Sequence, residues 1–174
     1  MLYSKKGGVT MFKKANTASS IISLSLFSLF TVFVGYVYRV QAEINSSEIV
    51  ALGGGAYGWD LHFNAKTVLF IIAALTLILA LIFHVLKLIT RKKLVFPILC
   101  AALSVASLAF FYVLSTELVI FMFFRIVLHI DISNIALLKA VKPTVVIVLL
   151  ISELTALVFS VLHHINNNNA NNAQ

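Results

Sequence analysis

Charged side chains are scarce in this sequence of 174 residues. Only 11% of the residues are charged and 61% are hydrophobic, whereas soluble domains average roughly 25% charged residues. A soluble fold of this size could not cover so much apolar surface with so few charges. The apolar residues also occur in long unbroken runs, without helical or strand spacing. Both observations predict a single-domain membrane protein that crosses the bilayer several times.

Cysteine is nearly absent, since Cys100 is the single one and lies within an apolar run. One cysteine can form no disulfide within the chain and no metal site built on a cysteine pair. Membrane disulfide oxidoreductases are therefore excluded, and we interpret Cys100 as a small buried hydrophobic residue. The chain also lacks a serine nucleophile elbow and a metalloprotease helix motif. The sequence thus predicts a non-enzymatic protein without cofactor or metal.

Basic residues outnumber acidic ones, with a net charge of +7 and a pI of about 9.7. In a soluble protein this excess would suggest a nucleic-acid partner. Here no basic patch carries interleaved aromatic residues on a soluble module, so no nucleic-acid binding is expected. We expect the lysines and arginines to collect at the cytoplasmic ends of helices, where they contact anionic membrane lipid.

Four apolar runs are long enough to cross a bilayer as helices of about twenty residues, or roughly 30 Å. They predict an all-α integral membrane protein, in which residues 1–165 form one bundle of four transmembrane helices. The asparagine-rich tail, residues 166–174, has no large apolar side chain to pack and is predicted to be disordered. The predicted spans are residues 21–38, 67–88, 94–114 and 144–164.

The two sides of the predicted bundle differ in basic charge. Four spans place both termini on one side, together with the short link after the second span. Eight of the thirteen lysines and arginines fall on that side and five on the other. The positive-inside rule therefore predicts an N-in, C-in orientation. In the short link, Arg91, Lys92 and Lys93 form a basic group that we expect to contact lipid or a cytoplasmic protein partner.

Residues 5–9, Lys-Lys-Gly-Gly-Val, lie shortly before a second methionine, Met11. This peptide can be encoded by a nucleotide run that contains a strong bacterial ribosome-binding site. If the gene uses that run, translation starts at Met11 and not at Met1. The same interpretation predicts a bacterial protein, located in the inner membrane.

The segment 118–130, between the third and fourth spans, is apolar except for Arg125 and His129. Thirteen residues are too few to cross a bilayer. The segment could lie on the outer surface as an interfacial helix, re-enter the membrane, or extend the third span. We favour an interfacial or extended helix, in which Arg125 contacts lipid or a partner.

Small and polar residues recur along one face of each predicted span. In lipid, helices associate through close packing of small residues and through polar contacts. These stripes therefore predict a bundle, although a stripe could serve a contact between subunits of a homo-oligomer instead. The stripes are Ser28, Thr31 and Gly35; Ala73, Thr76, Ala80 and His84; Ala102, Ala106 and Ala109; and Glu153, Ala156, Ser160 and His164.

Glu153 lies near the middle of the fourth span and is one of only six acidic residues. A charged residue at a helix centre costs about 2.5–3.5 kcal/mol on insertion scales, so we expect this carboxyl to be protonated or paired. Thr76 lies at a similar depth, and Ser104 and Ser107 are predicted to be within reach. The site is either a structural hydrogen bond between helices or a site for a proton or cation.

Three histidines fall near the ends of the second and fourth spans, on the side of the termini. We interpret His84, His163 and His164 as interfacial residues at helix ends. His163 and His164 are adjacent and point about 100° apart on a helix. No neighbouring cysteine, aspartate or histidine in the sequence completes a set of metal ligands.

Two functions are compatible with this pattern. The first is a non-enzymatic, oligomeric membrane anchor or sensor that couples to a cytoplasmic partner. Analogy with small bacterial proteins of this shape suggests a place in an antiviral defence system. The alternative is an ion channel or proton-coupled transporter that uses Glu153. Few polar residues line the predicted helices, and no inverted repeat or pair of broken helices is visible, which disfavours the alternative.

Overall fold

The computed structural model describes residues 3–51, 65–90, 93–130 and 135–171, and these residues are helical apart from short connections. No strand occurs within the described ranges, so the predicted all-α class is confirmed. Four of the helices are long and apolar enough to span a membrane. The elements are α1 (Tyr3–Ala51), α2 (Ala65–Ile89), α3 (Val95–Leu114), α4 (Glu117–Met122), the π-helical turn η1 (Phe123–Val127) and α5 (Ile135–Asn171).

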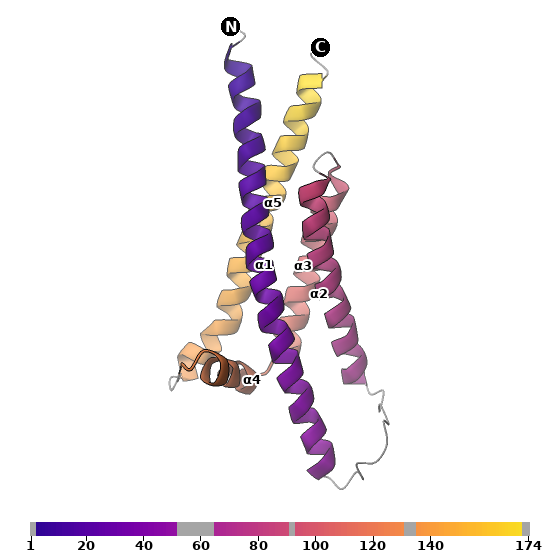
Figure 1. Ribbon diagram of the computed structural model, residues 1–174, viewed down its shortest axis with the longest axis vertical. Coiled ribbons are helices and arrows are strands. Elements are labelled where there is room, and N and C mark those ends of the chain that lie inside the picture. The colour runs from indigo at the N-terminus through magenta and orange to yellow at the C-terminus, as the bar shows by residue number, and fades with distance from the viewer. Residues whose placement is uncertain (1–2, 52–64, 91–92, 131–134, 172–174) are drawn as a thin grey trace.

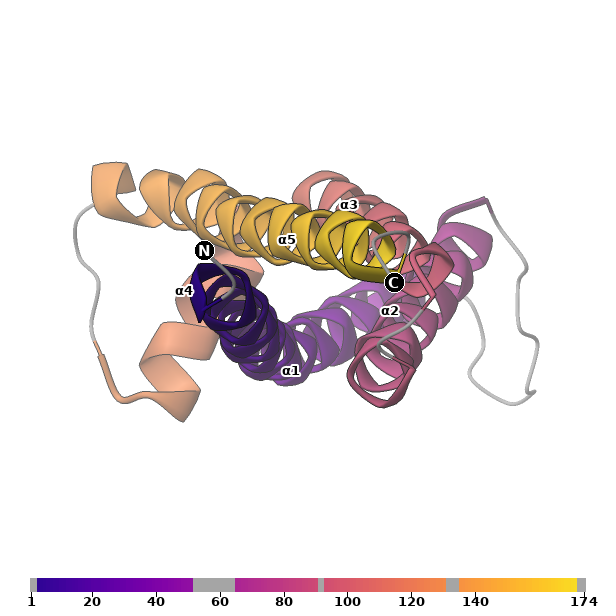
Figure 2. The ribbon, with the colours of Figure 1, turned by 90° about the horizontal axis from the view of Figure 1, so that it is seen from above.

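The four spanning helices form a closed ring of contacts. α1 packs along α5 and α2 packs along α3, while α1 with α2 and α3 with α5 complete the ring. The beginning of α1 and the end of α5 lie at the same end of the bundle (Figures 1 and 2). We call this the terminal end and the other the distal end. An even number of spans, such as the four predicted ones, places the two ends of the chain on the same side.

Two of the helices are longer than the predicted spans. α1 has 49 residues, which corresponds to about 70 Å at 1.5 Å per residue. This is well beyond a hydrocarbon core of roughly 30 Å. Hydropathy identifies the part of a helix that tolerates lipid and does not mark where the helix itself ends. The candidate membrane segments are Met11–Val40, Val68–Ile89, Val95–Leu114 and Lys139–Asn169.

The end of α5 also differs from the prediction. The helix continues to Asn171, whereas the sequence predicted a disordered tail from residue 166. The side-chain amide nitrogens of Asn167 and Asn168 lie 3.3 Å from Nε2 of His163 and His164, one helical turn earlier. Such pairs at four-residue spacing stabilise a helix, so the prediction is wrong over residues 166–171. Residues 172–174 lie outside the described part of the chain.

The segment 118–130 begins with the short helix α4, continues with the π-helical turn η1 and is not helical over residues 128–130. Ser115 leaves the helical conformation, with φ −81° and ψ 130°, so α3 ends there and does not extend into this segment. α4 then crosses the distal part of the bundle beside α1 and α5 (Figures 1 and 2). Its Val119 and Ile120 are fully buried. The Lys142 ammonium donates a hydrogen bond of 2.7 Å to the Ser115 carbonyl and thereby ties the end of α3 to α5.

The bundle interior is divided into an apolar and a polar half. In the distal half, aromatic rings fill the centre: the Phe111 ring is fully buried and lies 5.3 Å from Phe30 and 5.6 Å from Phe33, between centroids. Offset and edge-to-face aromatic pairs at such distances are favourable. In the terminal half, the buried positions are largely polar. These are Asn16, Ser20, Ser23, His84, Lys87, Ser104, Ser107, Glu153, Ser160 and His163.

The predicted stripes face the interior on two helices and lie largely outside the buried face on the other two. Most stripe residues of α2 and α5 are buried, whereas Ala102 and Ala109 of α3 are exposed. On α1, Ser28 and Thr31 are half-buried and Gly35 is exposed, and a Cβ added at Gly35 would meet nothing within 4 Å. The buried faces of α1 and α3 carry small polar residues in the terminal half of the bundle and aromatic residues in the distal half. The buried face of α1 is Ser20, Ser23, Phe27, Phe30, Val34 and Val37.

Candidate functional site

Each of the four spanning helices contributes one polar side chain to a single buried cluster. α1 supplies Ser23, α2 supplies His84, α3 supplies Ser104 and α5 supplies Glu153. None of these residues is more than 2% exposed. We call the four residues the mid-membrane cluster. It lies at the boundary between the polar and the apolar half of the interior.

Hydrogen bonds connect the whole cluster. The Ser23 hydroxyl donates to Oε1 of Glu153 at 2.6 Å, and Nε2 of His84 lies 3.2 Å from the same oxygen. The same Nε2 also lies 3.2 Å from the Ser104 hydroxyl oxygen. A carboxylate with these neighbours is stabilised by bonds that are stronger than those between neutral groups. Glu153 is therefore paired, as one of the two sequence expectations requires.

One atom of the cluster retains unused bonding capacity. Oε2 of Glu153 is buried and has no hydrogen-bond partner among the described residues. Leaving a buried acceptor unsatisfied costs roughly 1–3 kcal/mol. Such atoms are uncommon in native proteins and point to an unfilled binding role or a source of strain. The unsatisfied oxygen makes this cluster the leading candidate for a functional site.

Two further chemically active side chains border the cluster. The Cys100 thiol on α3 is fully buried, and ligating atoms of His84, Cys100 and Glu153 all lie within 4.8 Å of one another. Lys87, which is 5% exposed, lies one helical turn beyond His84 toward the terminal end. Within the described residues, nitrogen, sulfur and oxygen donors thus converge from three different helices.

Two interpretations of the histidines are corrected by this geometry. His84 is 1% exposed, so its side chain is buried among the helices and does not face the surroundings of the bundle. His163 is likewise buried, at 7%. The expectation that no cysteine or acidic residue completes a ligand set is also wrong. Cys100 and Glu153 are distant from His84 in the sequence, and only the packing of α3 and α5 against α2 brings them together.

The structure brings two residues of the predicted intramembrane site, Glu153 and Ser104, into the mid-membrane cluster, but not the other two hydroxyls. Thr76 donates to the Ala73 carbonyl at 2.8 Å, and Ser107 donates to the Leu103 carbonyl at 2.9 Å. Both hydroxyls are therefore satisfied within their own helices, a common arrangement for Ser and Thr in helices. The residues that actually bond to Glu153 from α1 and α2, Ser23 and His84, were not predicted.

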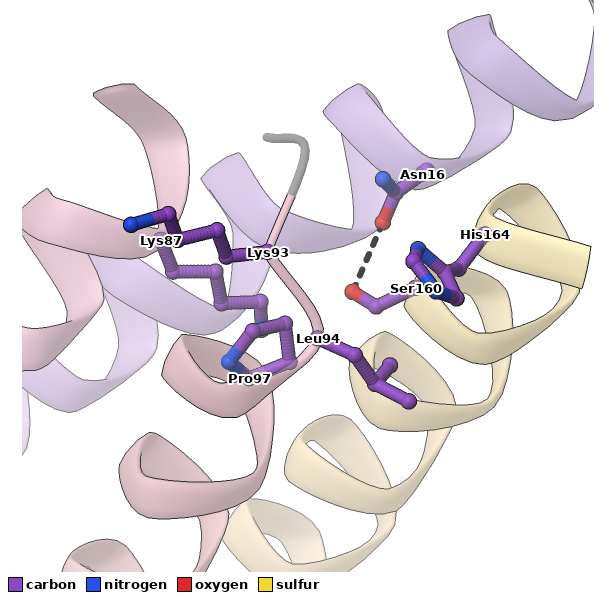
Figure 3. Close-up of a pocket in the computed structure, with 7 residues that line it drawn as sticks. All are labelled: Asn16, Lys87, Lys93, Leu94, Pro97, Ser160 and His164. Atoms are coloured by element: carbon purple, nitrogen blue, oxygen red, sulfur yellow. Dashed lines mark hydrogen bonds between the residues drawn. The ribbon is translucent and has the colours of Figure 1, made fainter. Parts of the chain in front are cut away.

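Polar side chains continue from the cluster toward the terminal end. The Ser160 hydroxyl donates to the side-chain oxygen of Asn16 at 2.9 Å, which joins α5 to α1. Figure 3 shows this pair beside a small pocket that is also lined by Lys87, Lys93, Leu94, Pro97 and His164. On the distal side, the rings of Phe27, Phe30 and Phe111 fill the interior. Among the described residues, the polar route from the cluster therefore leads to the terminal end.

The predicted basic contact residues lie at opposite ends of the bundle. Lys93 is exposed at the terminal end, while Arg91 and Lys92 lie outside the described residues. Arg125 belongs to η1 in the distal part, where it is exposed, and its guanidinium carbon lies 5.9 Å from the centroid of the Phe121 ring. A single partner on one side of a membrane can therefore contact only one of these two basic sites.

Comparison of the chain with protein-family models, with curated protein sequences and with solved structures found no match. A bundle of helices does not by itself indicate a function, since the same architecture supports many unrelated activities. The chemistry of the mid-membrane cluster is therefore the basis for a functional proposal.

Proposed function

We propose that this protein is a non-enzymatic sensor subunit of a bacterial inner membrane, and that the state of the mid-membrane cluster sets how its four spanning helices pack. The supporting observation is that one buried hydrogen-bonded cluster receives a side chain from all four helices. A ligand that binds there bonds to several helices at once. If the four helices can pack in two arrangements, the ligand shifts the equilibrium between them toward the one it binds more tightly. The size of the shift equals the difference in binding free energy between the two arrangements.

The terminal end is the proposed output surface. With an N-in, C-in orientation, this end faces the cytoplasm, and Lys93 is exposed there. Arg91 and Lys92 precede Lys93 in the sequence. The beginning of α1 and the end of α5 extend beyond the α2–α3 pair at this end (Figure 1). A change in the angle between α1 and α5 would be largest at these extended ends. A cytoplasmic protein with an acidic surface is the partner that this basic end fits best.

Two wider aspects belong to the same proposal. Assembly into a homo-oligomer would let the basic ends of several subunits act on one partner. The particle mass in detergent measures the number of subunits. A place in an antiviral defence system is an analogy at the level of protein shape. The identity of the neighbouring genes is the observation that bears on it.

The rival function is a channel or proton-coupled transporter with Glu153 in the path. The unpartnered Oε2 of Glu153 favours it, because a conducting site needs a group that can bind and release an ion. The apolar layer of Phe27, Phe30 and Phe111 disfavours it, because an ion would meet no polar side chain there. Flux into liposomes that is present in the wild type and absent in Glu153→Gln would replace the sensor proposal with this alternative.

Neutralising the basic group at the terminal end should release the cytoplasmic partner. We expect the triple variant Arg91→Gln, Lys92→Gln, Lys93→Gln to lose most of the partner that co-purifies with wild-type protein from native membranes. The amount of partner that remains bound to the triple variant should also change less with added salt than in the wild type, because attraction between exposed charges is screened by salt. Quantitative mass spectrometry of affinity-purified membranes measures it.

Lys139→Gln is the matched control, since it removes a basic charge from the beginning of α5, in the distal part of the bundle. It should leave the co-purified partner unchanged. Equal partner recovery from the triple variant and the wild type would contradict the proposed output surface. If partner recovery depends on the basic group but is unaffected by Glu153→Gln, the protein is an anchor for the partner and the sensor proposal is contradicted.

A further inference from the structure

We propose that His84, Cys100 and Glu153 form a binding site for a divalent transition-metal ion of the zinc type. This deepens the proposed function and rests on it, because the ion would be the ligand that the sensor detects. It also revises the expectation from the sequence that the chain has no metal site. The three residues come from α2, α3 and α5, so one ion would join three spanning helices.

The geometry is close to that of a metal site. Zinc–nitrogen and zinc–oxygen bonds are about 2.0–2.2 Å and zinc–sulfur bonds about 2.3 Å, so ligand atoms in a tetrahedral site lie roughly 3.3–3.6 Å apart. The three ligating atoms here already lie within 4.8 Å of one another. Small rotations of side chains would close the remaining gap. All three residues are at most 2% exposed, so water competes little for the ion.

The unsatisfied oxygen of Glu153 is an independent observation that points to a ligand. Oε2 is buried without a partner, while Ser23 and His84 both contact the other oxygen, Oε1. The Ser23 hydroxyl therefore fixes the orientation of the carboxylate and leaves Oε2 available. Supporting hydrogen bonds of this kind are typical of metal-binding carboxylates. A bound cation would satisfy this buried acceptor.

The donor set selects the class of metal. One imidazole nitrogen, one thiol sulfur and one carboxylate oxygen suit Zn²⁺ and related transition metals, whereas Mg²⁺ and Ca²⁺ prefer oxygen ligands alone. The thiol loses its proton on binding, and the resulting thiolate and the carboxylate balance the charge of the ion. Lys87 is the one other charged side chain near the site on the four spanning segments. Three protein ligands leave a fourth position open for water.

Lys87 links metal binding to the terminal end. The Lys87 ammonium acts electrostatically on Glu153, and the Lys87 side chain also lines the pocket beside Asn16 and Ser160 (Figure 3). A divalent ion at Glu153 would repel this ammonium toward that pocket. There the Asn16–Ser160 hydrogen bond joins α1 to α5. Metal binding would therefore act on the contact between the two helices that extend from the terminal end.

Titration of purified full-length protein in detergent with Co²⁺ tests the site, because cobalt substitutes for zinc and reports its ligands by absorption. We expect one cobalt per chain, a thiolate-to-cobalt charge-transfer band, and loss of the signal when Zn²⁺ is added. Cys100→Ser should lose the band and bind at least about tenfold more weakly. His84→Gln should weaken binding similarly, while His164→Gln removes a histidine outside the cluster and should bind as wild type does.

Three results would overturn the site: no charge-transfer band in folded wild-type protein, equal cobalt affinity in Cys100→Ser and wild type, or loss of the bound ion in His164→Gln. Far-ultraviolet circular dichroism establishes that each protein is folded, and the wild-type spectrum alone is decisive if a variant unfolds. The two proposals fail separately. If the protein binds metal but metal does not change partner recovery, the sensor proposal is contradicted. If Glu153→Gln changes partner recovery but the protein binds no metal, only the metal-site proposal is contradicted.

Discussion

Replacing His84 with alanine should lower the free energy of unfolding by about 3–5 kcal/mol, the usual cost of removing one partner from a buried ion pair. Nε2 of His84 lies 3.2 Å from Oε1 of Glu153 and from the Ser104 hydroxyl. The imidazole also packs on the ring of Phe27, with centroids 4.7 Å apart. The substitution therefore leaves a buried carboxyl short of a partner and opens a cavity between α1 and α2.

Equilibrium unfolding of detergent-solubilised protein by a denaturing detergent measures this change. His164→Ala is the matched control, because it removes the same side chain from a half-buried position near the end of α5. We expect a loss below about 1 kcal/mol for the control, as for most exposed or partly exposed positions. Equal losses for the two variants would mean that the His84 contacts contribute little to the bundle.

Replacing Phe111 with alanine should destabilise the distal half of the bundle by about 3 kcal/mol. The ring is fully buried and meets Phe30 and Phe33 at centroid distances of 5.3 Å and 5.6 Å. Truncation of a buried phenylalanine in a soluble core costs about 3–5 kcal/mol. We expect the lower limit here, because unfolded helices remain in an apolar solvent and mainly the packing part of the cost is lost.

The same unfolding measurement applies, with Val113→Ala as the control. Val113 lies on the same helix and is 78% exposed, so its truncation should change the free energy of unfolding by less than about 0.5 kcal/mol. A similar small effect for Phe111→Ala would show that the aromatic layer is loosely packed. The layer could then open to a continuous path, and the transporter alternative would gain support.

The membrane-spanning architecture could be predicted from the sequence because it depends on hydropathy and length alone. Runs of about twenty apolar residues have few alternatives to spanning helices in a chain with so little charge. The even number of spans then places both termini at one end. The full length of α1 could not be predicted in this way, since residues 3–10 and 41–51 lie outside the candidate membrane span Met11–Val40 although they remain helical.

The composition of the site could be predicted only in part. An acidic residue in an apolar run identifies Glu153 without any knowledge of packing. Its partners depend on how each helix is rotated and how deep it lies. Ser23 was missed because the predicted first span began at residue 21, which placed this serine at the membrane edge, whereas the structure has a span from Met11 to Val40.

The cysteine was missed for a related reason. Taken alone, Cys100 is a small apolar residue like its neighbours, and its meaning appears only beside His84 and Glu153. The alanines of α3 were predicted to form its packing face for the opposite reason. Small size indicates where helices can approach each other and not where they do. The buried face of α3 instead carries Cys100, Ser104, Ser107, Leu108 and Phe111.

A double-mutant cycle between His84→Ala and Glu153→Gln tests most directly whether side chains of separate helices act as one unit inside the membrane. If they do, the two free-energy losses will fail to add, and the coupling between them will exceed about 1 kcal/mol, within the range known for residues in contact. Losses that add to within about 0.3–0.5 kcal/mol would place the two side chains in independent environments. That result would contradict the cluster and the sensor and metal site built on it.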